Sequence, residues 1–402
     1  MILHRLSAGL VLIVLIGVST ASAQAPCVIA QGSVTLPLAC PAGAYIAPSA
    51  LTLTPDVPVP PAETPPLSFY GGYLTVEGTA FEIDAMATAY PGLVDVVTYG
   101  QSWAKQTGGL TTPAGDVLLG YDLRAMKITN KALPGPKPQI IMTTGLHARE
   151  LPSREILRRF AHFLVERYGI DAQATWTLDN REVVLVLDAN PDGVWMTALG
   201  MKYQSTPFPQ RKNLDTTGCT RWTSSQWKPT ITAHCGVDLN RNSSTGWGPL
   251  PSVHTSTDPN SQYFRGAQAN IAPEITALQT FVAGLVAGRT ATSMFKSWHN
   301  FGRKEGYPLG YQATPGSSLA SVLAPIAQRF AALNGYTPGQ IYTSINPSPG
   351  AFEDYVDGLG VRATITETMS GVAGDFPAYT TVDALWTLNR PVMLEAAKIA
   401  GE

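Results

Sequence analysis

Two polar side chains with the spacing of a metal site follow a short apolar run in the first half of the chain. His147 and Glu150 lie between the run Ile140–Met142 and a segment with helical spacing that continues to Tyr168. We therefore expect both side chains in a strand-to-helix turn at the carboxyl end of a strand, where open α/β sheets build their sites. An imidazole and a carboxylate three positions apart can bind one divalent metal, and zinc suits this mixed set. Alone, the pair is a weak signal.

Two more residues of types that bind metals, a histidine and a glutamate, follow other predicted strands. His299 ends a predicted strand over residues 292–298, and Glu367 ends one over residues 361–366. Only His147 and His299 among the histidines fall at strand ends; the others lie in the N-terminal segment, inside a helix or in loops (His4, His162, His234, His254). A lone histidine in such a place is more often an ordinary residue at the edge of the core. Several strand ends that carry such side chains favour one shared metal site.

The segments that must position these residues alternate between two periodicities. Helical spacing covers residues 76–89, 152–168, 273–287, 319–334 and 382–399, and further strand-like runs cover residues 93–99, 123–128 and 183–187. A glycine-rich stretch over residues 108–120 is predicted to be an insertion or a hairpin. Strands that alternate with helices predict an α/β fold, a three-layer α/β/α sandwich around a mixed, mostly parallel sheet.

The N-terminal residues are typical of a secretion signal followed by a proline-rich extension. Residues 1–23 have a weakly positive start, the apolar run Leu10–Val18 and the small-residue cleavage site Ala21-Ser-Ala23. A membrane anchor is the alternative, but the run is short for a span. Residues 24–67 are rich in proline and show no pattern long enough for a domain. We expect a secreted protein, extracellular or periplasmic, with no membrane segment after cleavage and a catalytic domain over residues 68–402.

The cysteines and the charge restrict the compartment and the partners. Four cysteines can form two disulfides in three ways. Our hypothesis is the pairing that closes the two shortest loops, Cys27–Cys40 and Cys219–Cys235. Such disulfides form in an oxidising compartment. Only 14% of the 402 residues are charged, the formal net charge is −2, and the sequence has no run of Lys or Arg. These features argue against a nucleic-acid partner, and we expect a monomer.

Together these residues resemble the zinc carboxypeptidase family, the metallopeptidases that remove C-terminal amino acids. The match covers most of residues 70–402 and keeps the order of the family. It rests on His147-Ala-Arg-Glu150, Asn190-Pro-Asp-Gly193, Arg211-Lys212, Gly236-Val-Asp-Leu-Asn-Arg-Asn242, Ser297-Trp-His299, Tyr342 and Thr364-Ile-Thr-Glu367. The resemblance implies an enzyme with one Zn²⁺ per chain, bound by His147, Glu150 and His299.

The residue types in this set account for the chemistry that the resemblance implies. Two neutral imidazoles and one carboxylate leave zinc with a net positive charge and an open position, where water becomes acidic enough to attack an amide at neutral pH. Glu367 has the family's place as the general base, which takes the water proton and passes it to the leaving amine. Arg211 matches the arginine that stabilises the tetrahedral oxyanion.

The resemblance also implies residues that bind the substrate. Arg241 with Asn240 matches the pair that captures the terminal carboxylate, for which a planar guanidinium is well suited. Arg149 is implied as a further contact on the carboxylate side, and Tyr342 as the tyrosine that closes over bound substrate. Asp238 is placed to accept the second imidazole N–H of the first histidine ligand and so fix its tautomer.

Two stretches depart from the family pattern, and the specificity pocket is ambiguous. Asn300-Phe301 replaces hydroxyl-bearing residues after the third ligand, and the loop over residues 343–349 is longer than in relatives. Counting back from Glu367 places Phe352 at the floor of the pocket, whereas matching an acidic–aromatic pair places Glu353 there. The low overall charge and the apolar Phe301 favour Phe352, and with it apolar or aromatic C-terminal residues.

The sequence therefore predicts a secreted zinc metallocarboxypeptidase that hydrolyses the C-terminal peptide bond of peptides or proteins. A related zinc amidohydrolase that acts on cell-wall peptides or acyl-amino acids is the alternative enzyme, but Asn240-Arg241 and Tyr342 favour peptide trimming. An inactive relative kept as a binding module usually lacks a ligand or the base, and here all of them are present.

Overall fold

The computed structural model divides the chain into two compact units. It describes residues 26–31, 34–39, 67–223, 235–248, 254–289, 293–314, 316–369 and 376–402, the first two ranges by their backbone alone. The units are residues 1–52 and 53–402, and in the first of them β1 (Pro26–Gln31) pairs with β2 (Val34–Ala39) in antiparallel register. The predicted secretion signal, the proline-rich run and the pairing of Cys27 with Cys40 lie outside the described residues.

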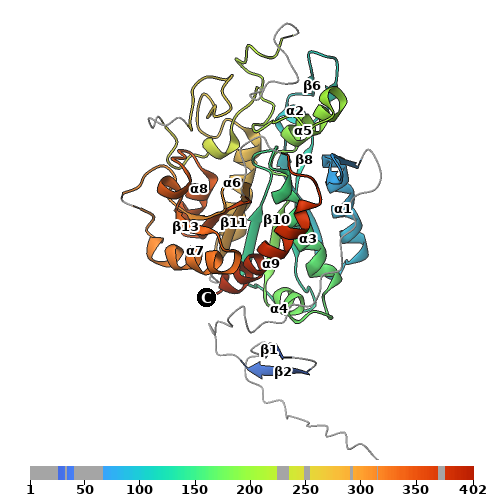
Figure 1. The fold of residues 1–402 in the computed structure, drawn as a ribbon, viewed down its shortest axis with the longest axis vertical. Coiled ribbons are helices and arrows are strands. Elements are labelled where there is room, and N and C mark those ends of the chain that lie inside the picture. Colours follow the sequence, from blue (N-terminus) through green and yellow to red (C-terminus); the bar gives the residue numbers. More distant parts are fainter. Residues whose placement is uncertain are drawn as a thin grey trace, which may run out of the picture. The chain divides into compact units, whose positions relative to one another are not determined.

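The second unit is organised around an eight-stranded mixed sheet with the order β13-β12-β14-β11-β9-β10-β8-β5 (Figure 1). Its strands are β5 (Val94–Gln101), β8 (Asp122–Ile128), β9 (Gln139–Thr143), β10 (Glu182–Val186), β11 (Met294–Asn300), β12 (Lys304–Tyr307), β13 (Thr337–Gln340) and β14 (Arg362–Thr368). The pairs β13–β12, β14–β11, β11–β9 and β9–β10 are parallel, and the others are antiparallel. The predicted mixed, mostly parallel sheet is confirmed.

Helices cover both faces of the sheet because successive strand residues point to opposite sides. Ile140 and Met142 of β9 belong to a core with helices of one face, and Ile141 belongs to a core with helices of the other. The first face carries α1 (Val76–Ala89), α3 (Leu151–Glu166), α4 (Ala172–Asn180), α7 (Ala320–Asn334) and α9 (Thr381–Ile399), and the second carries α6 (Pro273–Val286) and α8 (Phe352–Gly358). Figure 1 shows the three layers that the sequence predicts.

Most of the predicted elements are present with ends that differ by one or two residues, and several short ones were not predicted. The glycine-rich stretch contains a hairpin of β6 (Leu110–Thr111) and β7 (Val117–Leu118). Unpredicted elements are β1, β2, α4, α8, β12, β13, β3 (Ser68–Phe69), β4 (Tyr73–Leu74), α2 (Trp103–Gln106), α5 (Pro191–Gln204) and the short helices η2 (Leu239–Arg241) and η3 (Ile341–Ile345). The helix α5 was not predicted because its buried residues, such as Val194 and Met196, do not form a single apolar stripe.

The hypothesis of a Cys219–Cys235 disulfide is confirmed, with the two Cα atoms 5.6 Å apart. The bridge closes a loop between the segment of Arg211 and the segment of Asp238. Such a cross-link reduces the conformational freedom of the unfolded chain.

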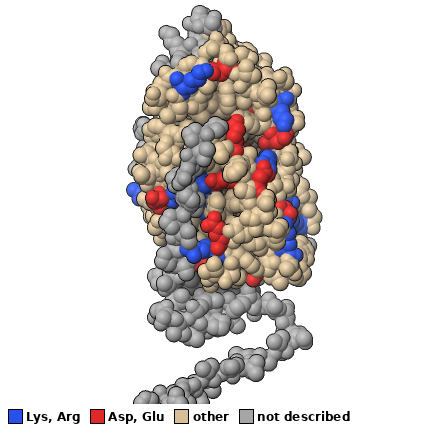
Figure 2. All heavy atoms as spheres, turned by 90° about the vertical axis from the view of Figure 1, so that its right-hand side faces the viewer, with Lys and Arg blue, Asp and Glu red and all other residues tan. Residues whose placement is uncertain are grey.

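Charged side chains of both signs are interspersed on the face of the molecule that Figure 2 shows. At the β5 edge of the sheet, Lys131 Nζ lies 2.6 Å from Asp95 Oδ1, and Lys105 Nζ lies 2.7 Å from Asp122 Oδ1. Exposed pairs of this kind stabilise a fold by at most about 1 kcal/mol each.

No helix within the described ranges is both long enough and apolar enough to cross a membrane.

Two buried carboxyl groups hold α2 against the segments that lead to the site. Glu274 Oε1 accepts the N–H of Trp103 at 2.7 Å, and Asp192 Oδ2 accepts the N–H of Ala104 at 2.8 Å. Glu274 Oε2 also accepts a bond from Asn213 Nδ2 at 2.9 Å, which ties α6 to the chain just after Arg211. Burial, and then the negative charge of Asp192, raise the pKa of Glu274 from 4.5 to about 8.

This raised pKa predicts a stability that decreases with pH. The folded state binds the Glu274 proton more tightly than the unfolded state, so the stabilisation is complete below the ordinary pKa and is lost as the pH rises through about 8. Between these limits the unfolding free energy should fall by up to about 1.4 kcal/mol per pH unit. The unfolding free energy is measured by denaturant titration at several pH values. Glu274→Gln should lack this part of its pH dependence, whereas Glu77→Gln, a change at an exposed residue, should keep it. Equal slopes in all three proteins would contradict the assignment.

Candidate metal centre

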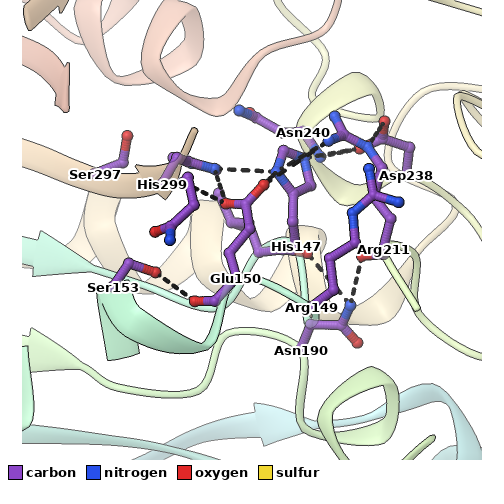
Figure 3. A network of polar contacts seen from close by, with 12 residues as sticks. His147, Arg149, Glu150, Ser153, Asn190, Arg211, Asp238, Asn240, Ser297 and His299 are labelled. Atoms are coloured by element: carbon purple, nitrogen blue, oxygen red, sulfur yellow. Dashed lines mark hydrogen bonds and ion pairs between the residues drawn. The ribbon is translucent and has the colours of Figure 1, made fainter. Parts of the chain in front are cut away.

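Three side chains that commonly bind metals converge at the carboxyl ends of β9 and β11. His147 and Glu150 lie in the turn between β9 and α3, and His299 lies in β11. His147 Nδ1 lies 2.8 Å from Glu150 Oε1 and 3.0 Å from His299 Nδ1, and His299 Nδ1 lies 3.0 Å from Glu150 Oε2 (Figure 3). One ligand atom of each residue lies within 4.8 Å of the other two, and all three residues are buried. The structure thus brings the predicted ligands together.

The donor set fits a zinc ion. His147 Nε2 lies 3.3 Å from Asp238 Oδ1, which favours an N–H at Nε2 and leaves the lone pair of Nδ1 directed at the cluster. The backbone N–H of Asn300 donates to Glu150 Oε2 at 3.1 Å and orients the carboxylate. Nitrogen lone pairs and a carboxylate this close repel one another unless a proton or a cation lies among them. Two imidazoles and one carboxylate are the donors of a zinc site with an open position.

The buried charges hold two of the three ligands in the protonation state that a metal requires and favour a proton on the third. Burial and the charge of Arg211 lower the pKa of His147, so its imidazole is neutral. Burial opposes the ionised form of Glu150, but the two histidines hold the pKa of this carboxyl well below its usual range. Burial also opposes charge on His299, yet Glu150 raises the pKa of that imidazole to about 9. A proton on His299 and a divalent cation therefore compete for the same position.

Asp238 connects the cluster to Arg211. Arg211 Nε donates to Asp238 Oδ2 at 2.8 Å, and Arg211 Nη1 lies 3.3 Å from His147 Nδ1 (Figure 3). Asp238 Oδ1 accepts the N–H of Asn240 at 3.1 Å, at the start of η2. Burial opposes its charge, but Arg211 and His147 hold the pKa of Asp238 well below its usual range. A single ionised carboxylate thus orients a ligand, an arginine and the backbone of η2.

The Asn190-Pro-Asp-Gly193 motif fixes the backbone under the centre and does not itself face the ligands. Asn190 Nδ2 donates to the carbonyl of Leu146 at 3.3 Å and to that of Arg211 at 3.4 Å. A Cβ on Gly193 would lie 2.6 Å from the Lys212 carbonyl oxygen and 2.8 Å from the Ala148 Cβ. Only glycine allows this approach. The motif therefore holds the turn of His147 and the backbone of Arg211 together.

Glu367 lies beside His299 on the same face of the sheet. The two residues are register partners in the parallel pair β11–β14. Glu367 lines the pocket in front of the ligands, as do His147 and Glu150. Burial raises the pKa of Glu367 to about 8; His299 and Arg211 oppose this shift, and Glu150 and Glu353 add to it. A divalent cation at the centre would favour the ionised carboxylate.

The same pocket contains the predicted carboxylate-binding residues. Asn240 and Arg241 line it from η2, and Arg149 lines it from the turn after β9. Arg149 Nη1 donates to Gln262 Oε1 at 3.0 Å. Each of the three residues is buried.

The lining of the pocket could not be inferred fully from the sequence. Tyr342 is absent from the described residues that line the pocket, although Ile341, Ser344 and Ile345 of the same turn η3 line it. His254, which the sequence placed in an unremarkable polar loop, does line it. No local pattern marks His254, because its position depends on contacts with residues distant in the sequence.

The floor of the pocket carries Glu353. Phe352 is fully buried in the core, with its ring centroid 5.4 Å from that of Phe295, and it does not line the pocket. Glu353 does line it: Oε1 accepts a hydrogen bond from Ser297 Oγ, and the buried Oε2 has no hydrogen-bond partner in the described part of the chain. The register that places Phe352 at the floor is therefore wrong, because neighbouring residues of α8 point to different sides.

Comparisons with known proteins agree with this arrangement. A family model described as zinc carboxypeptidase matches residues 81–387. Carboxypeptidase A2 of Mus musculus is 26% identical over 298 residues, which are 73% of this chain and 61% of the relative. Metallocarboxypeptidase A of Trichophyton tonsurans is 30% identical over 264 residues, 63% of this chain and 56% of the relative. The chain thus spans about three-fifths of the length of the relatives that it matches.

Solved structures share the fold. The structure of thrombin activatable fibrinolysis inhibitor superposes with a TM-score of 0.66 at 19% identity, covering 82% of this chain and 75% of that one. Carboxypeptidase A from Helicoverpa armigera gives a TM-score of 0.63 at 21% identity, covering 82% of this chain and 75% of that one. At such identities the likeness concerns the fold alone.

The convergence of the three ligands predicts one zinc per chain. His147→Ala and His299→Ala should each lose the metal, because two donors cannot hold it tightly. His162→Ala is the matched control: this histidine contacts two carboxylates, Glu82 and Glu166, yet lies on α3 away from the centre. Atomic absorption on dialysed, folded protein gives the stoichiometry. Retention of one zinc by either ligand variant would contradict the set.

Proposed function

The chain belongs to the zinc carboxypeptidase family, and on that premise we propose that it is a secreted zinc-dependent metallocarboxypeptidase that removes the C-terminal residue of peptides and proteins. The observation that carries this proposal is that one pocket is lined by Arg241 and by two residues of the metal-binding cluster, His147 and Glu150. An endopeptidase has no need for a buried cation that recognises the end of a chain.

Arg241 has the donors that a terminal carboxylate needs. Its Nε donates to the His254 carbonyl at 2.8 Å, Nη1 to the Asn240 carbonyl at 2.6 Å, and Nη2 to Asn346 Oδ1 at 3.2 Å. A guanidinium has five N–H groups, so one remains on each terminal nitrogen, in the arrangement that pairs two carboxylate oxygens. Asn240 Oδ1 accepts the N–H of Phe352 at 2.7 Å, which leaves its amide nitrogen for the same carboxylate.

The remaining residues of the pocket support hydrolysis of the adjacent amide. When bound to His147, Glu150 and His299, zinc supplies a Lewis acid that polarises a carbonyl and makes water more acidic. Glu367 takes a proton from the attacking water and gives it to the leaving amine. Arg211, held by Asp238, presents its other guanidinium nitrogens to the developing oxyanion.

Glu353 supports a preference for basic C-terminal residues, which reverses the expectation of apolar ones. A buried carboxylate with one unpartnered oxygen is unfavourable until a cation or a donor reaches it. Ile341, Ile345 and Ile365 line the same pocket and suit an aliphatic stem. The side chains of Lys and Arg combine such a stem with a terminal cation.

Secretion rests on the N-terminal signal, and the Cys219–Cys235 disulfide supports it, because disulfides persist in oxidising compartments.

Exopeptidase character is tested with paired peptides that end in a free carboxylate or an amide. Wild type should cleave the free form and not the amidated form. Arg241→Ala should raise KM for the free form by 10- to 100-fold, about 1.5–3 kcal/mol for hydrogen bonds to a charged group, because the carboxylate loses its bidentate partner. Equal cleavage of free and amidated peptides by wild type would contradict the proposal.

The role of Glu367 is separable from metal binding. Glu367→Gln should keep one zinc and bind substrate as wild type does, while kcat falls by a factor of about 100 to 10,000, the usual contribution of a general base. Stopped assays with the zinc-loaded protein measure kcat, and metal analysis on the same sample is the control. A loss below about tenfold would show that Glu367 is not the base.

Specificity should depend on Glu353. Wild type should release C-terminal Lys or Arg faster than Phe or Leu, and Glu353→Gln should lower kcat/KM for the basic peptides about 100-fold, within the range of buried charge pairs. Peptides ending in Phe or Leu are the internal control and should change little. Faster release of Phe or Leu by wild type would exclude this role for Glu353.

A further inference from the structure

We propose that Tyr263 is a positioning residue for Arg211: the face of its ring holds the guanidinium in the plane in which it meets the oxyanion. This inference rests on the proposed function, since it concerns the arginine that stabilises the tetrahedral intermediate. Tyr263 lies outside the motifs that carry the family resemblance.

The ring of Tyr263 lies against the guanidinium of Arg211 in the pocket. The guanidinium carbon lies 5.4 Å from the centroid of the ring, within the distance of a cation–π contact, and both residues line the pocket. The negative face of an aromatic ring attracts a cation without accepting any particular N–H of it. The contact therefore leaves the terminal N–H groups of Arg211 available for the substrate.

Within the described residues, hydrogen bonds alone do not fix the plane of this guanidinium. Nε donates to Asp238 Oδ2 at 2.8 Å, and Nη1 lies 3.3 Å from His147 Nδ1, the lone pair of which is directed at the metal position. Glu150 Oε1 lies 4.0 Å from Nη1, beyond the distance of a hydrogen bond. With zinc bound, the bond to Asp238 is therefore the remaining hydrogen bond of this group to the described residues. A planar group held by one such bond can still turn about it, and the ring of Tyr263 restricts this rotation.

Repulsion by two neighbouring arginines makes a contact of this kind more valuable. Burial, followed by the charge of Arg211, lowers the pKa of Arg149 to about 10. Burial also lowers the pKa of Arg241; the charge of Asp238 opposes this shift, and that of Arg211 adds to it. The three guanidinium groups therefore repel one another. The ring face of Tyr263 offsets part of this repulsion, whereas a second carboxylate would occupy the donors that the oxyanion needs.

The backbone and a second ring hold Tyr263 in place. Its carbonyl accepts the N–H of Ser256 at 2.9 Å, and the carbonyl of the next residue, Phe264, accepts the N–H of Asp238 at 2.7 Å. The ring of His254 meets the ring of Tyr263 edge to face, with centroids 5.6 Å apart. The hydrogen bonds of Tyr263 within the described residues use its backbone and not its hydroxyl. The proposed role therefore belongs to the ring.

The test compares Tyr263→Leu, which removes the ring, with Tyr263→Phe, which keeps it. Tyr263→Leu should lower kcat about 10-fold, in the range of a partly desolvated cation–π contact. It should change KM less than about twofold, because the oxyanion develops only in the transition state. Calorimetry should show that the zinc-loaded variant binds a phosphinate peptide, a tetrahedral analogue, about 10-fold more weakly than wild type. Tyr263→Phe should keep kcat and analogue binding within about threefold of wild type.

A double variant tests whether the ring acts through Arg211. Arg211→Ala should lower kcat by a factor of about 100 or more, the usual loss of one oxyanion donor. Adding Tyr263→Leu should then lower kcat by less than about twofold, because the group that the ring positions is gone. A further loss of about 10-fold in the double variant would show that Tyr263 acts independently of Arg211 and would overturn the proposal.

Trp176→Leu is the matched control, because Arg181 lies over this ring outside the pocket, with its guanidinium carbon 4.7 Å from the centroid. It should leave kcat and analogue binding unchanged. Zinc content and melting temperature confirm the folding of each variant, and Tyr263→Met replaces Tyr263→Leu if the latter does not fold.

The remaining outcomes separate this proposal from the proposed function. Equal losses in Tyr263→Phe and Tyr263→Leu, or no loss in either, would overturn the role of the ring. A loss in Arg211→Ala with none in Tyr263→Leu would refute the role of Tyr263 alone. Full activity of Arg211→Ala would refute the oxyanion role in the proposed function, and the role of Tyr263 with it.

Discussion

The metal centre depends on two imidazole nitrogens and a carboxylate that the fold holds about 3 Å apart in a buried place, where they repel one another unless a proton or a cation lies among them. Neither histidine can move away from the cluster. His147 is held by the turn that follows β9, and His299 is a strand residue paired with Glu367 of β14. The backbone N–H of Asn300 holds the carboxylate of Glu150 in place. A divalent cation relieves this repulsion, and the same cation supplies the chemistry that the family uses.

Asp238 extends this constraint to the substrate side of the pocket. Its two oxygens face His147, Arg211 and the backbone of η2. Because η2 carries Asn240 and Arg241, one fully buried carboxylate sets the distance between the metal centre and the groups proposed to bind the chain end. In the proposed function, that distance determines which peptide bond lies at the metal, and so how many residues are removed at a time. Loss of Asp238 should therefore affect metal affinity and substrate binding together.

The sequence predicted the layers from local patterns, and it predicted the metal ligands from the strand ends together with the family resemblance. Apolar runs mark β9, β11 and β14, and in parallel strands the residues near their carboxyl ends meet at one edge, which brings His147, His299 and Glu367 together. Elements such as α5 and η3 were not predicted, because their residues show no sustained periodicity. The residue at the floor of the pocket was misplaced by one position: α8 turns about 100° per residue, so Phe352 enters the core while Glu353 lines the pocket. His254 could not be predicted, since only its bond to Arg241 places it.

The central claim is zinc-dependent removal of single residues from the C-terminus, and mass spectrometry of a digestion over time tests it most directly. A peptide with a blocked N-terminus and several Lys or Arg residues at its C-terminus is incubated with the zinc-loaded chain, with and without a chelator. The account predicts a ladder of products that each lack one more C-terminal residue, which chelation abolishes and added zinc restores. Internal fragments without a ladder, or a ladder that persists after the zinc has been removed, would contradict the account.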